Sequence, residues 1–407
     1  MTRYRRTPEE HPVITEPVAA LAGTLADDGL PAYVYDLGRL AEHAAAVRAA
    51  LPAGVELYYA AKANPAAEIL RALAPHVTGY EVASGGELAH VRGTAPELPL
   101  AFGGPGKTEA ELRLALDLGV HRFHVESESE LRLLAALAAE RPDRAPAEVL
   151  LRVNLPAGDR SLDGAALAMG GRPSPFGLDP ERLTACLPLC AGPALRLRGI
   201  HAHLASGLDA AAQLALAERI TGWARDLADR HRLPLDEVNL GGGMHVDYRR
   251  PGSRFDWAGY GTGLAELADR HPGLTLRVEP GRALTAYCGW YVTEVLDVRH
   301  SGGEAFAVLR GGTHHLRTPA AKQHDHPFTV LPREHWDRPW PRPGIHGEPV
   351  TLAGQLCTPK DVLARRVPVP RLRAGDRIAF ALAGAYAWNI SHHSFLMHPA
   401  PAFYYLG

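Results

Sequence analysis

Short apolar runs alternate with longer amphipathic runs along the first two thirds of the chain. The short runs have the length and apolar content of buried strands. The longer runs, such as TEAELRLALDLG and AAQLALAERITGWARDLADR, carry apolar residues at helical spacing. We therefore expect eight strands separated by helices, at residues 55–62, 79–84, 98–104, 121–127, 148–155, 197–204, 237–243 and 275–281.

Eight alternating strand and helix units over about 230 residues favour a (β/α)8 barrel of TIM type over an open sheet. After about residue 283 the pattern changes to strand-like segments with Gly and Pro turns and no comparable helices. The early run AYVYD, with no helix expected before it, should join this β-rich part. The predicted fold class is therefore α/β, with a barrel domain at 37–282 and a β-rich domain, a β-barrel or sandwich, formed by 1–36 and 283–407.

Residues 316–348 are rich in Pro, His and Arg, and we expect them to form loops at the surface.

Composition and charge exclude several classes of function. The 407 residues are 46% hydrophobic and 22% charged, as in ordinary soluble proteins, and the net charge of −2 gives no basic field for nucleic acid or anionic membranes. No apolar run approaches the roughly 20 residues of a membrane span, and the N-terminal segment lacks the apolar core of a secretory signal. The four cysteines form no CxxC pair, so we expect no structural zinc and a reducing, cytoplasmic location.

Polar and glycine residues stand where the predicted barrel strands end, which is the active-site face of such barrels. Lys62 ends the first strand, His203 lies near the end of the sixth, Gly241–Gly243 end the seventh, and Glu279–Arg282 (EPGR) end the eighth. Each feature alone is more often structural: a snorkelling lysine, a satisfied core histidine, or a turn. Four of them on one predicted rim indicate a functional site.

These groups fit the chemistry of one cofactor. A lysine in an apolar site can lose its proton and bond covalently to an aldehyde. Consecutive glycines leave backbone N–H groups free to wrap a phosphate. A carboxylate can keep a pyridine nitrogen protonated, so that the ring accepts electrons, and an imidazole can stack on the ring. Together these groups indicate pyridoxal 5′-phosphate.

The sequence also resembles the fold-type III pyridoxal-phosphate decarboxylases, the group of diaminopimelate and ornithine decarboxylases. The matching segments are YYAAKANP, YEVASGGEL, GIHAHLASGL, NLGGGMHVDY, EPGR, GQLCTPKDVL and AGAYAW, in family order between residues 58 and 388. The cofactor residues that this resemblance implies are Lys62 (covalent attachment), His203 (ring face), Glu279 (ring nitrogen), Ser206, Gly242, Gly243, Gly281 and Arg282 (phosphate side) and Tyr386 (from the second domain).

The resemblance further implies a homodimer with shared active sites that acts on a small amino acid substrate. In the family, the cysteine matching Cys357 comes from the partner subunit and returns a proton after carbon dioxide leaves. Without that context, Cys357 would simply be a buried strand residue. Asp361, by the same resemblance, faces the distal end of the substrate.

Departures from the family's pattern near Cys357 bear on the substrate. Diaminopimelate decarboxylases usually have Glu next to this cysteine, whereas this chain has Thr358, followed by Pro359 and Lys360. Their arginine-containing segment near the C-terminus is replaced by ISHHSFLMHPAP. This segment and GGTHHLRTPAAKQHDHPF look like the siderophore-biosynthetic branch, which decarboxylates a citryl-diaminopropionate type of intermediate.

A carboxylate-rich substrate would suit basic and imidazole side chains at its distal end. The residues expected to supply them are His314, His315, Lys360, His392 and His393. The alternative is that these are surface histidines of a chain that contains 21 of them. Because Asp361 could instead receive an amine, diaminopimelate, ornithine or lysine remains the alternative substrate.

Three other classes of function remain open on the sequence. His201 and His203 could bind zinc in a metal-dependent barrel hydrolase, but the last two strands end in glycines and EPGR rather than in further ligands. A non-catalytic pyridoxal-phosphate-binding protein would not need both Lys62 and Cys357. A racemase of this barrel type would have arginine where Glu279 stands.

Overall fold

The computed structural model describes residues 14–156, 167–168, 170–318, 321 and 324–407. The chain divides into two compact units. The barrel unit consists of Ala41–His245 and Phe255–Leu284, and the β-rich unit consists of Met1–Leu40, Val246–Arg254 and Thr285–Gly407. The predicted domain ranges differ from these units by a few residues at each boundary, and they assign Val246–Arg254 to the barrel rather than to the β-rich part.

The barrel unit is built around a closed sheet of parallel strands in the order β10-β11-β2-β3-β4-β5-β6-β8. Pairing of β10 with both β8 and β11 closes the sheet. The prediction of a (β/α)8 barrel and of its eight strand positions is therefore confirmed. The strands are β2 (Val55–Ala60), β3 (Gly79–Val82), β4 (Leu100–Phe102), β5 (Arg122–Val125), β6 (Ala147–Arg152), β8 (Leu195–His201), β10 (Glu237–Asn239) and β11 (Thr275–Val278).

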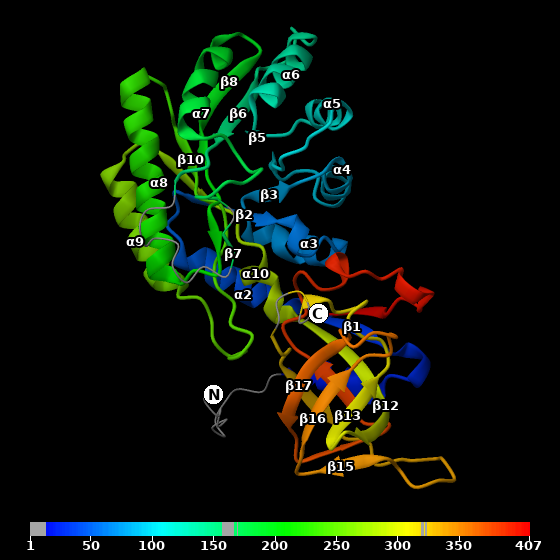
Figure 1. Cartoon of the computed structure of the whole chain (residues 1–407). Coiled ribbons are helices and arrows are strands. Elements are labelled where there is room, and N and C mark those ends of the chain that lie inside the picture. The colour runs from blue at the N-terminus through cyan, green and yellow to red at the C-terminus, as the bar shows by residue number, and fades with distance from the viewer. Residues whose placement is uncertain (1–13, 157–166, 169, 319–320, 322–323) are drawn as a thin grey trace. The chain divides into compact units, whose positions relative to one another are not determined.

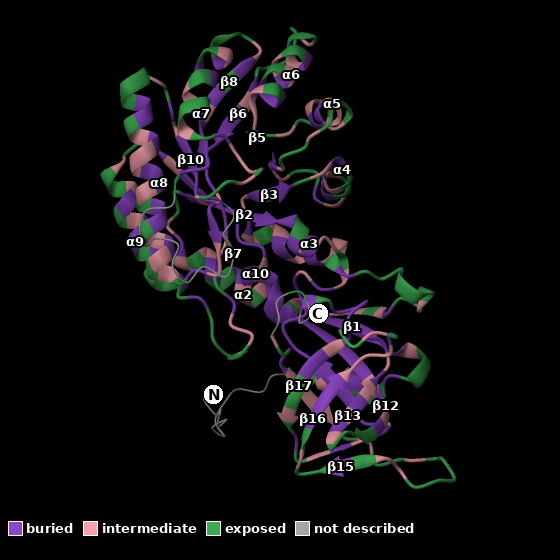
Figure 2. Cartoon of the chain, in the orientation of Figure 1, coloured by how far each residue is buried: buried purple, intermediate pink, exposed green. Residues whose placement is uncertain are grey.

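Helices follow the strands and lie on the outside of the barrel (Figure 1). In α8, the buried positions recur every three or four residues, so one face packs inward while the other meets solvent (Figure 2). The helices are α2 (Leu37–Ala50), α3 (Ala67–Leu73), α4 (Gly85–Thr94), α5 (Glu109–Asp117), α6 (Glu128–Ala139), α7 (Pro180–Cys186), α8 (Ala210–His231), α9 (Trp257–Arg270) and α10 (Arg282–Thr285).

Local capping signals fix where several helices begin after a strand end. The side-chain oxygens of Ser84, Thr108 and Ser127 accept the backbone N–H three residues on, at the starts of α4, α5 and α6. Short 3-10 turns lie at Ala61–Ala63, Ala74–His76 and Leu187–Ala191, and a small antiparallel pair joins β7 (Leu167–Ala168) to β9 (Ala205–Ser206).

The inside of the barrel contains a layer of paired charges. The Arg277 guanidinium lies 2.6 Å from Glu56 Oε2 and 2.8 Å from Glu237 Oε1, and Arg122 Nε lies 2.6 Å from Glu237 Oε2. The ring of Tyr58 covers the Arg277 guanidinium at 4.0 Å. Because buried charges are tolerated only when they are paired, removal of one partner would be expected to cost about 3–5 kcal/mol.

The β-rich unit contains an eight-stranded sheet in the order β14-β19-β12-β13-β16-β17, with β1 and β20 paired beside β12, and a separate β15-β18 pair. The strands are β1 (Ala32–Asp36), β12 (Gly289–Ser301), β13 (Glu304–Leu309), β14 (Phe328–Leu331), β15 (Gly344–His346), β16 (Pro349–Ala353), β17 (Val362–Pro368), β18 (Arg371–Arg373), β19 (Arg377–Phe380) and β20 (Ala402–Leu406). Further 3-10 turns lie at Asp27–Gly29, Ala286–Cys288, Trp388–Ile390 and Phe395–Met397.

Two details of this unit correct the expectations. The run AYVYD does join the β-rich sheet as β1, but a helix, α1 (Glu16–Thr24), precedes it. Val18 and Ala22 of α1 pack into the same apolar cluster as Val34. The segment 316–348 is also more than a surface loop, because β14 and β15 form within it.

No helix in the part of the chain that the structure describes is both long and apolar enough to span a membrane.

Candidate active site

The carboxyl ends of β2 and β3 bring a lysine and a glutamate together. Ala60 is in register with Glu81, and Lys62 lies in the 3-10 turn directly after β2. The Lys62 ammonium forms an ion pair with the Glu81 carboxylate. The lysine side chain is 44% exposed, so it is accessible at the barrel rim rather than locked in the core.

Glu279 follows β11 and is buried among polar partners. Asn239 Nδ2 donates a hydrogen bond to Glu279 Oε1 at 2.6 Å, and Asn239 Oδ1 accepts one from the Gly241 N–H at 2.9 Å. Burial and the nearby charge of Glu81 raise the pKa of Glu279 to about 7, although the Asn239 hydrogen bond and Lys62 oppose the shift. A carboxyl group with this pKa can share a proton with a ring nitrogen near neutral pH.

The Gly241–Gly243 turn after β10 has no room for a side chain at any of its three positions. A Cβ atom on Gly242 would lie 2.3 Å from the Glu279 carbonyl oxygen, and one on Gly243 would lie 2.2 Å from the Ala205 carbonyl oxygen. Gly241 and Gly243 also have φ values of +69° and +97°, which favour glycine. A bare main-chain turn on the rim fits the phosphate end of the expected cofactor.

His203 and Ser206 lie beside this turn. The Gly242 N–H donates a hydrogen bond to His203 Nδ1 at 3.2 Å, which fixes the orientation of the ring. Burial, with Arg152 and Lys62 nearby, lowers the pKa of His203 to about 3, so the ring is neutral. The face of a neutral imidazole can stack on a flat cofactor ring. Ser206, three residues after His203 in the sequence, lies on β9 and is half-buried.

The eighth strand end continues through the EPGR segment. Gly281 is buried, and Arg282 is half-buried as the first residue of α10. Lys62, the glycine turn and Glu279 therefore all stand at strand ends of one barrel, as the sequence predicted. Taken together, these residues fit pyridoxal 5′-phosphate.

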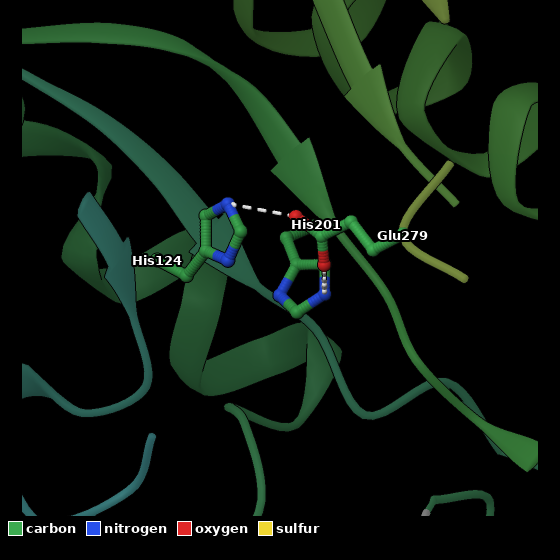
Figure 3. Close-up of side chains that lie close together, drawn as sticks. All are labelled: His124, His201 and Glu279. Carbon is green, nitrogen blue, oxygen red and sulfur yellow. Dashed lines mark ion pairs between the residues drawn. The ribbon is translucent and has the colours of Figure 1, made fainter. Parts of the chain in front are cut away.

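A second polar group lies inside the barrel beside Glu279. The rings of His124, on β5, and His201, at the end of β8, stack with centroids 4.2 Å apart. Both flank the Glu279 carboxylate (Figure 3). Burial, the largest cause, lowers the pKa of each imidazole well below its usual range. The alternative of a zinc pair formed by His201 and His203 does not match this grouping, because His201 lies with His124 and His203 faces the glycine turn.

Four of these residues were not among the expected site residues. Asn239 and Gln213 support the glycine turn, since Gln213 Nε2 donates to the Gly242 carbonyl at 3.2 Å. Asn239 directly precedes the glycines, and Glu81 stands inside the segment YEVASGGEL, so their positions were visible in the sequence. His124 offered no such signal, because it reads as an ordinary strand residue.

Asp361 in the β-rich unit has a structural role that the sequence did not indicate. Its carboxylate accepts hydrogen bonds from the backbone N–H groups of Thr313 at 2.6 Å and Leu356 at 2.8 Å, and the residue is only 2% exposed. These bonds join the loop at 311–316 to the loop that carries Cys357. Each Asp361 oxygen thus already accepts one backbone hydrogen bond, and a role for Asp361 at the distal end of the substrate stays a prediction.

The loop before Asp361 presents a thiol. Cys357 and Lys360 are exposed, whereas Thr358 is half-buried. Thr358 Oγ1 accepts the Lys360 N–H at 3.4 Å, which tightens the turn between them. Tyr386, the other expected contribution from this unit, is half-buried and accepts a hydrogen bond from Thr318 Oγ1 through its carbonyl group at 2.5 Å.

Two of the histidines expected at the distal end of the substrate are uncharged at neutral pH. Burial lowers the pKa of His314 to about 3 and that of His315 to about 4. His315 is tied to Tyr291 Oη at 3.0 Å and to the Pro399 carbonyl at 3.0 Å, so it holds the loop in place. A role for these two residues at the distal end of the substrate stays a prediction, and in it both would act as neutral imidazoles. His392 and His393 are exposed, with His393 stacked on Trp388 at 4.5 Å.

Comparisons with known proteins identify the family of the chain. Residues 37–286 match the family model described as "Pyridoxal-dependent decarboxylase, pyridoxal binding domain". The chain is 41% identical over 380 residues to 2-[(L-alanin-3-ylcarbamoyl)methyl]-2-hydroxybutanedioate decarboxylase of Staphylococcus aureus, covering 92% of this chain and 93% of that protein. It is 31% identical to L-glutamyl-[BtrI acyl-carrier protein] decarboxylase of Niallia circulans, covering 91% and 87% of the two chains.

Among solved structures, diaminopimelate decarboxylase from Helicobacter pylori complexed with L-lysine matches with a TM-score of 0.81 at 23% identity, covering 95% of this chain and 93% of that one. The chain therefore belongs to the pyridoxal-dependent decarboxylases. The expected enzyme class, a pyridoxal-phosphate-dependent carboxy-lyase, and the expected cofactor are both confirmed. Membership of this family argues against the three alternatives, a metal hydrolase, a racemase and a non-catalytic cofactor-binding protein.

Proposed function

We propose that the protein decarboxylates an α-amino acid joined through an amide to citrate, a citryl-diaminopropionate type of siderophore intermediate. The observation that carries this proposal is the 41% identity, over nearly the full length of both chains, to a decarboxylase of that chemistry. The substrate named for that relative is 2-hydroxybutanedioate with an alanin-3-yl-carbamoylmethyl substituent, which is the amide of citrate with 2,3-diaminopropionate.

In this proposal the side-chain amine of Lys62 would hold the cofactor covalently. Bound pyridoxal 5′-phosphate supplies an electron sink for the electron pair that is left when carbon dioxide departs. Glu279 would keep the ring nitrogen protonated through its negative charge, and the Asn239 hydrogen bond favours the ionised carboxylate that this requires. His203 stacks on the ring, and Gly242, Gly243, Ser206, Gly281 and Arg282 form the phosphate side.

The remaining groups belong to the β-rich unit. We assign Cys357, an exposed thiol, to return a proton to the α-carbon across the interface of a homodimer. Tyr386 is assigned to the cofactor, and Thr358, Lys360 and His314 to the substrate. At neutral pH His314 acts there as an uncharged hydrogen-bonding group, which leaves Lys360 to attract a carboxylate. We place the protein in the cytoplasm.

The alternative substrates are diaminopimelate, ornithine and lysine. The sequence kept them open mainly because Asp361 could have received a distal amine. The structure weakens that reason, because backbone N–H groups already occupy the Asp361 carboxylate.

Carbon dioxide release from a panel of substrates tests the proposal. Catalytic efficiency should be highest for the citrate amide of 2,3-diaminopropionate and lower for meso-diaminopimelate, lysine and ornithine. Efficient turnover of meso-diaminopimelate, with the citrate amide inert, would reject the proposed substrate.

A further inference from the structure

Three side chains that are typical metal ligands converge inside the barrel. His124 Nε2 lies 3.8 Å from Glu279 Oε1, and His201 Nε2 lies 3.7 Å from Glu279 Oε2. One ligand atom from each residue lies within 4.8 Å of the other two. Figure 3 shows both imidazoles beside the two carboxylate oxygens. No other group of three such side chains was found among the described residues.

Three of the four imidazole nitrogens of this group lack hydrogen-bond partners, whereas His124 Nε2 lies 3.3 Å from Asn239 Nδ2. Both ring nitrogens of His201 and Nδ1 of His124 are buried without a partner in the described structure, and the residues are 4% and 0% exposed. A buried polar atom without a partner typically costs about 1–3 kcal/mol. Neutral imidazole is also the commonest metal ligand among side chains. The barrel interior therefore retains unsatisfied lone pairs that a bound cation would satisfy.

Zinc binding requires a local adjustment of these three side chains. In a tetrahedral site with bonds of about 2.1 Å, neighbouring ligand atoms lie about 3.4 Å apart. The two measured distances, 3.8 and 3.7 Å, join the histidine nitrogens to different oxygens of Glu279. A tetrahedral site needs the carboxylate to turn until one oxygen faces both nitrogens, and ligand atoms now within 4.8 Å of one another to close to about 3.4 Å. Three protein ligands with one open position form a common arrangement for zinc bound by histidine and carboxylate.

We propose that, before the cofactor binds, His124, His201 and Glu279 hold a divalent transition metal ion of the zinc class, and that metal and pyridoxal 5′-phosphate exclude each other. They exclude each other because both need the Glu279 carboxylate, which the proposed function assigns to the ring nitrogen. The nearby cations do not prevent this binding, since Lys62 is paired with Glu81 and Arg152 with Glu126 at 2.7 Å. The proposal goes beyond decarboxylation, because it concerns the loading of the cofactor-free protein.

Calorimetric titration of the cofactor-free, full-length protein with zinc sulfate tests the site. We expect one zinc ion per chain, and binding at least about tenfold weaker in His124→Asn and in His201→Asn. His231→Asn, at the exposed end of α8, is the matched control and should bind like the wild type. Absence of stoichiometric binding by the wild type, or binding unchanged in both cluster variants, would overturn the proposal.

Two measurements on the wild type keep the test independent of how the variants fold. Cobalt(II) bound in place of zinc should show the absorption of a tetrahedral site with nitrogen and oxygen ligands. Zinc should raise the apparent dissociation constant of pyridoxal 5′-phosphate in proportion to the zinc concentration. An octahedral cobalt spectrum, or cofactor binding that is insensitive to zinc, would refute the proposal. Since no substrate is present, neither result bears on the decarboxylase assignment.

Discussion

At the residue scale, Glu81 connects the two groups that the cofactor needs. Its carboxylate pairs with the Lys62 ammonium, and its charge helps to raise the pKa of Glu279. The lysine that binds the aldehyde and the carboxyl group that faces the ring nitrogen therefore respond to the same neighbour. Small changes at Glu81 should alter both, even though this residue makes no bond to the expected cofactor.

Thr358 tests the substrate assignment. Replacing Thr358 with Glu supplies the carboxylate that diaminopimelate decarboxylases usually have beside the cysteine. If the new carboxylate reaches the distal ammonium of meso-diaminopimelate, the charge-assisted hydrogen bond between them, worth about 1.5–3 kcal/mol, should raise kcat/KM for this substrate by about 10- to 150-fold. Steady-state kinetics with both substrates measure the change, with Thr358→Gln as the uncharged control. An equal gain in the Gln variant would show that charge is not the cause.

His315 gives the β-rich unit a pH-dependent stability. Its folded-state pKa of about 4 lies below the usual value of 6.5, so protonation favours the unfolded chain. The stability that it contributes is complete above pH 6.5 and is lost as the pH falls towards 4, by about 2 kcal/mol between pH 7.5 and 5. His315→Gln should reduce this loss in urea unfolding, whereas the exposed His231→Gln should leave it unchanged. If the free energy of unfolding of His315→Gln depended on pH as that of the wild type does, this explanation would be contradicted.

At the element scale, parallel strands explain what the sequence could predict. Apolar runs marked the eight strands, and the carboxyl ends of parallel strands share one end of a barrel, so Lys62, the glycine turn and Glu279 could be placed together. The contribution of His124 could not be predicted, because β5 and β8 are separated by β6 in the sheet and their side chains meet only inside the closed barrel.

Two further features escaped sequence reasoning for local reasons. Helix α1 is short, with three Ala among its nine residues, and only Val18 and Ala22 are buried, so it carries little periodic signal. Asp361 acts through backbone N–H groups, and the partner at Thr313 is 48 residues away. Because every residue except proline has a backbone N–H group, no sequence motif indicates which residues donate to Asp361.

Gly243 tests the close packing of the turn after β10. Gly243→Ala places a Cβ atom 2.2 Å from the Ala205 carbonyl at a φ of +97°, so it should lower the free energy of unfolding by at least about 2 kcal/mol and weaken cofactor binding. Gly222→Ala, on α8 with nothing within 4 Å of the added atom, is the matched control and should be neutral or stabilising. Denaturant unfolding and cofactor titration give both values, and a wild-type result for Gly243→Ala would refute the packing argument.

At the scale of the whole molecule, the proposed reaction needs groups from both units. Lys62 and Glu279 lie in the barrel unit, whereas Cys357 lies on an exposed loop of the β-rich unit. The proposed homodimer supplies the thiol from the second chain. Each dimer would then contain two composite sites.

Mixing two inactive variants tests this sharing. Lys62→Ala and Cys357→Ala should each lose at least about 100-fold in kcat. After subunit exchange, activity should return, because a heterodimer with both changes on separate chains contains one intact site of its two. Light scattering and a tagged subunit establish that exchange has occurred. Exchanged heterodimers that stay inactive would show that the sites are not shared.

The most direct test of the account is to find the lysine that carries the cofactor. Borohydride reduction of the protein isolated with pyridoxal 5′-phosphate, followed by protease digestion and mass spectrometry, identifies the modified residue. We predict one pyridoxyl group per chain on Lys62, at the end of β2 beside Glu81. Stoichiometric label on any other lysine, or no reducible cofactor in the protein, would contradict the central claim.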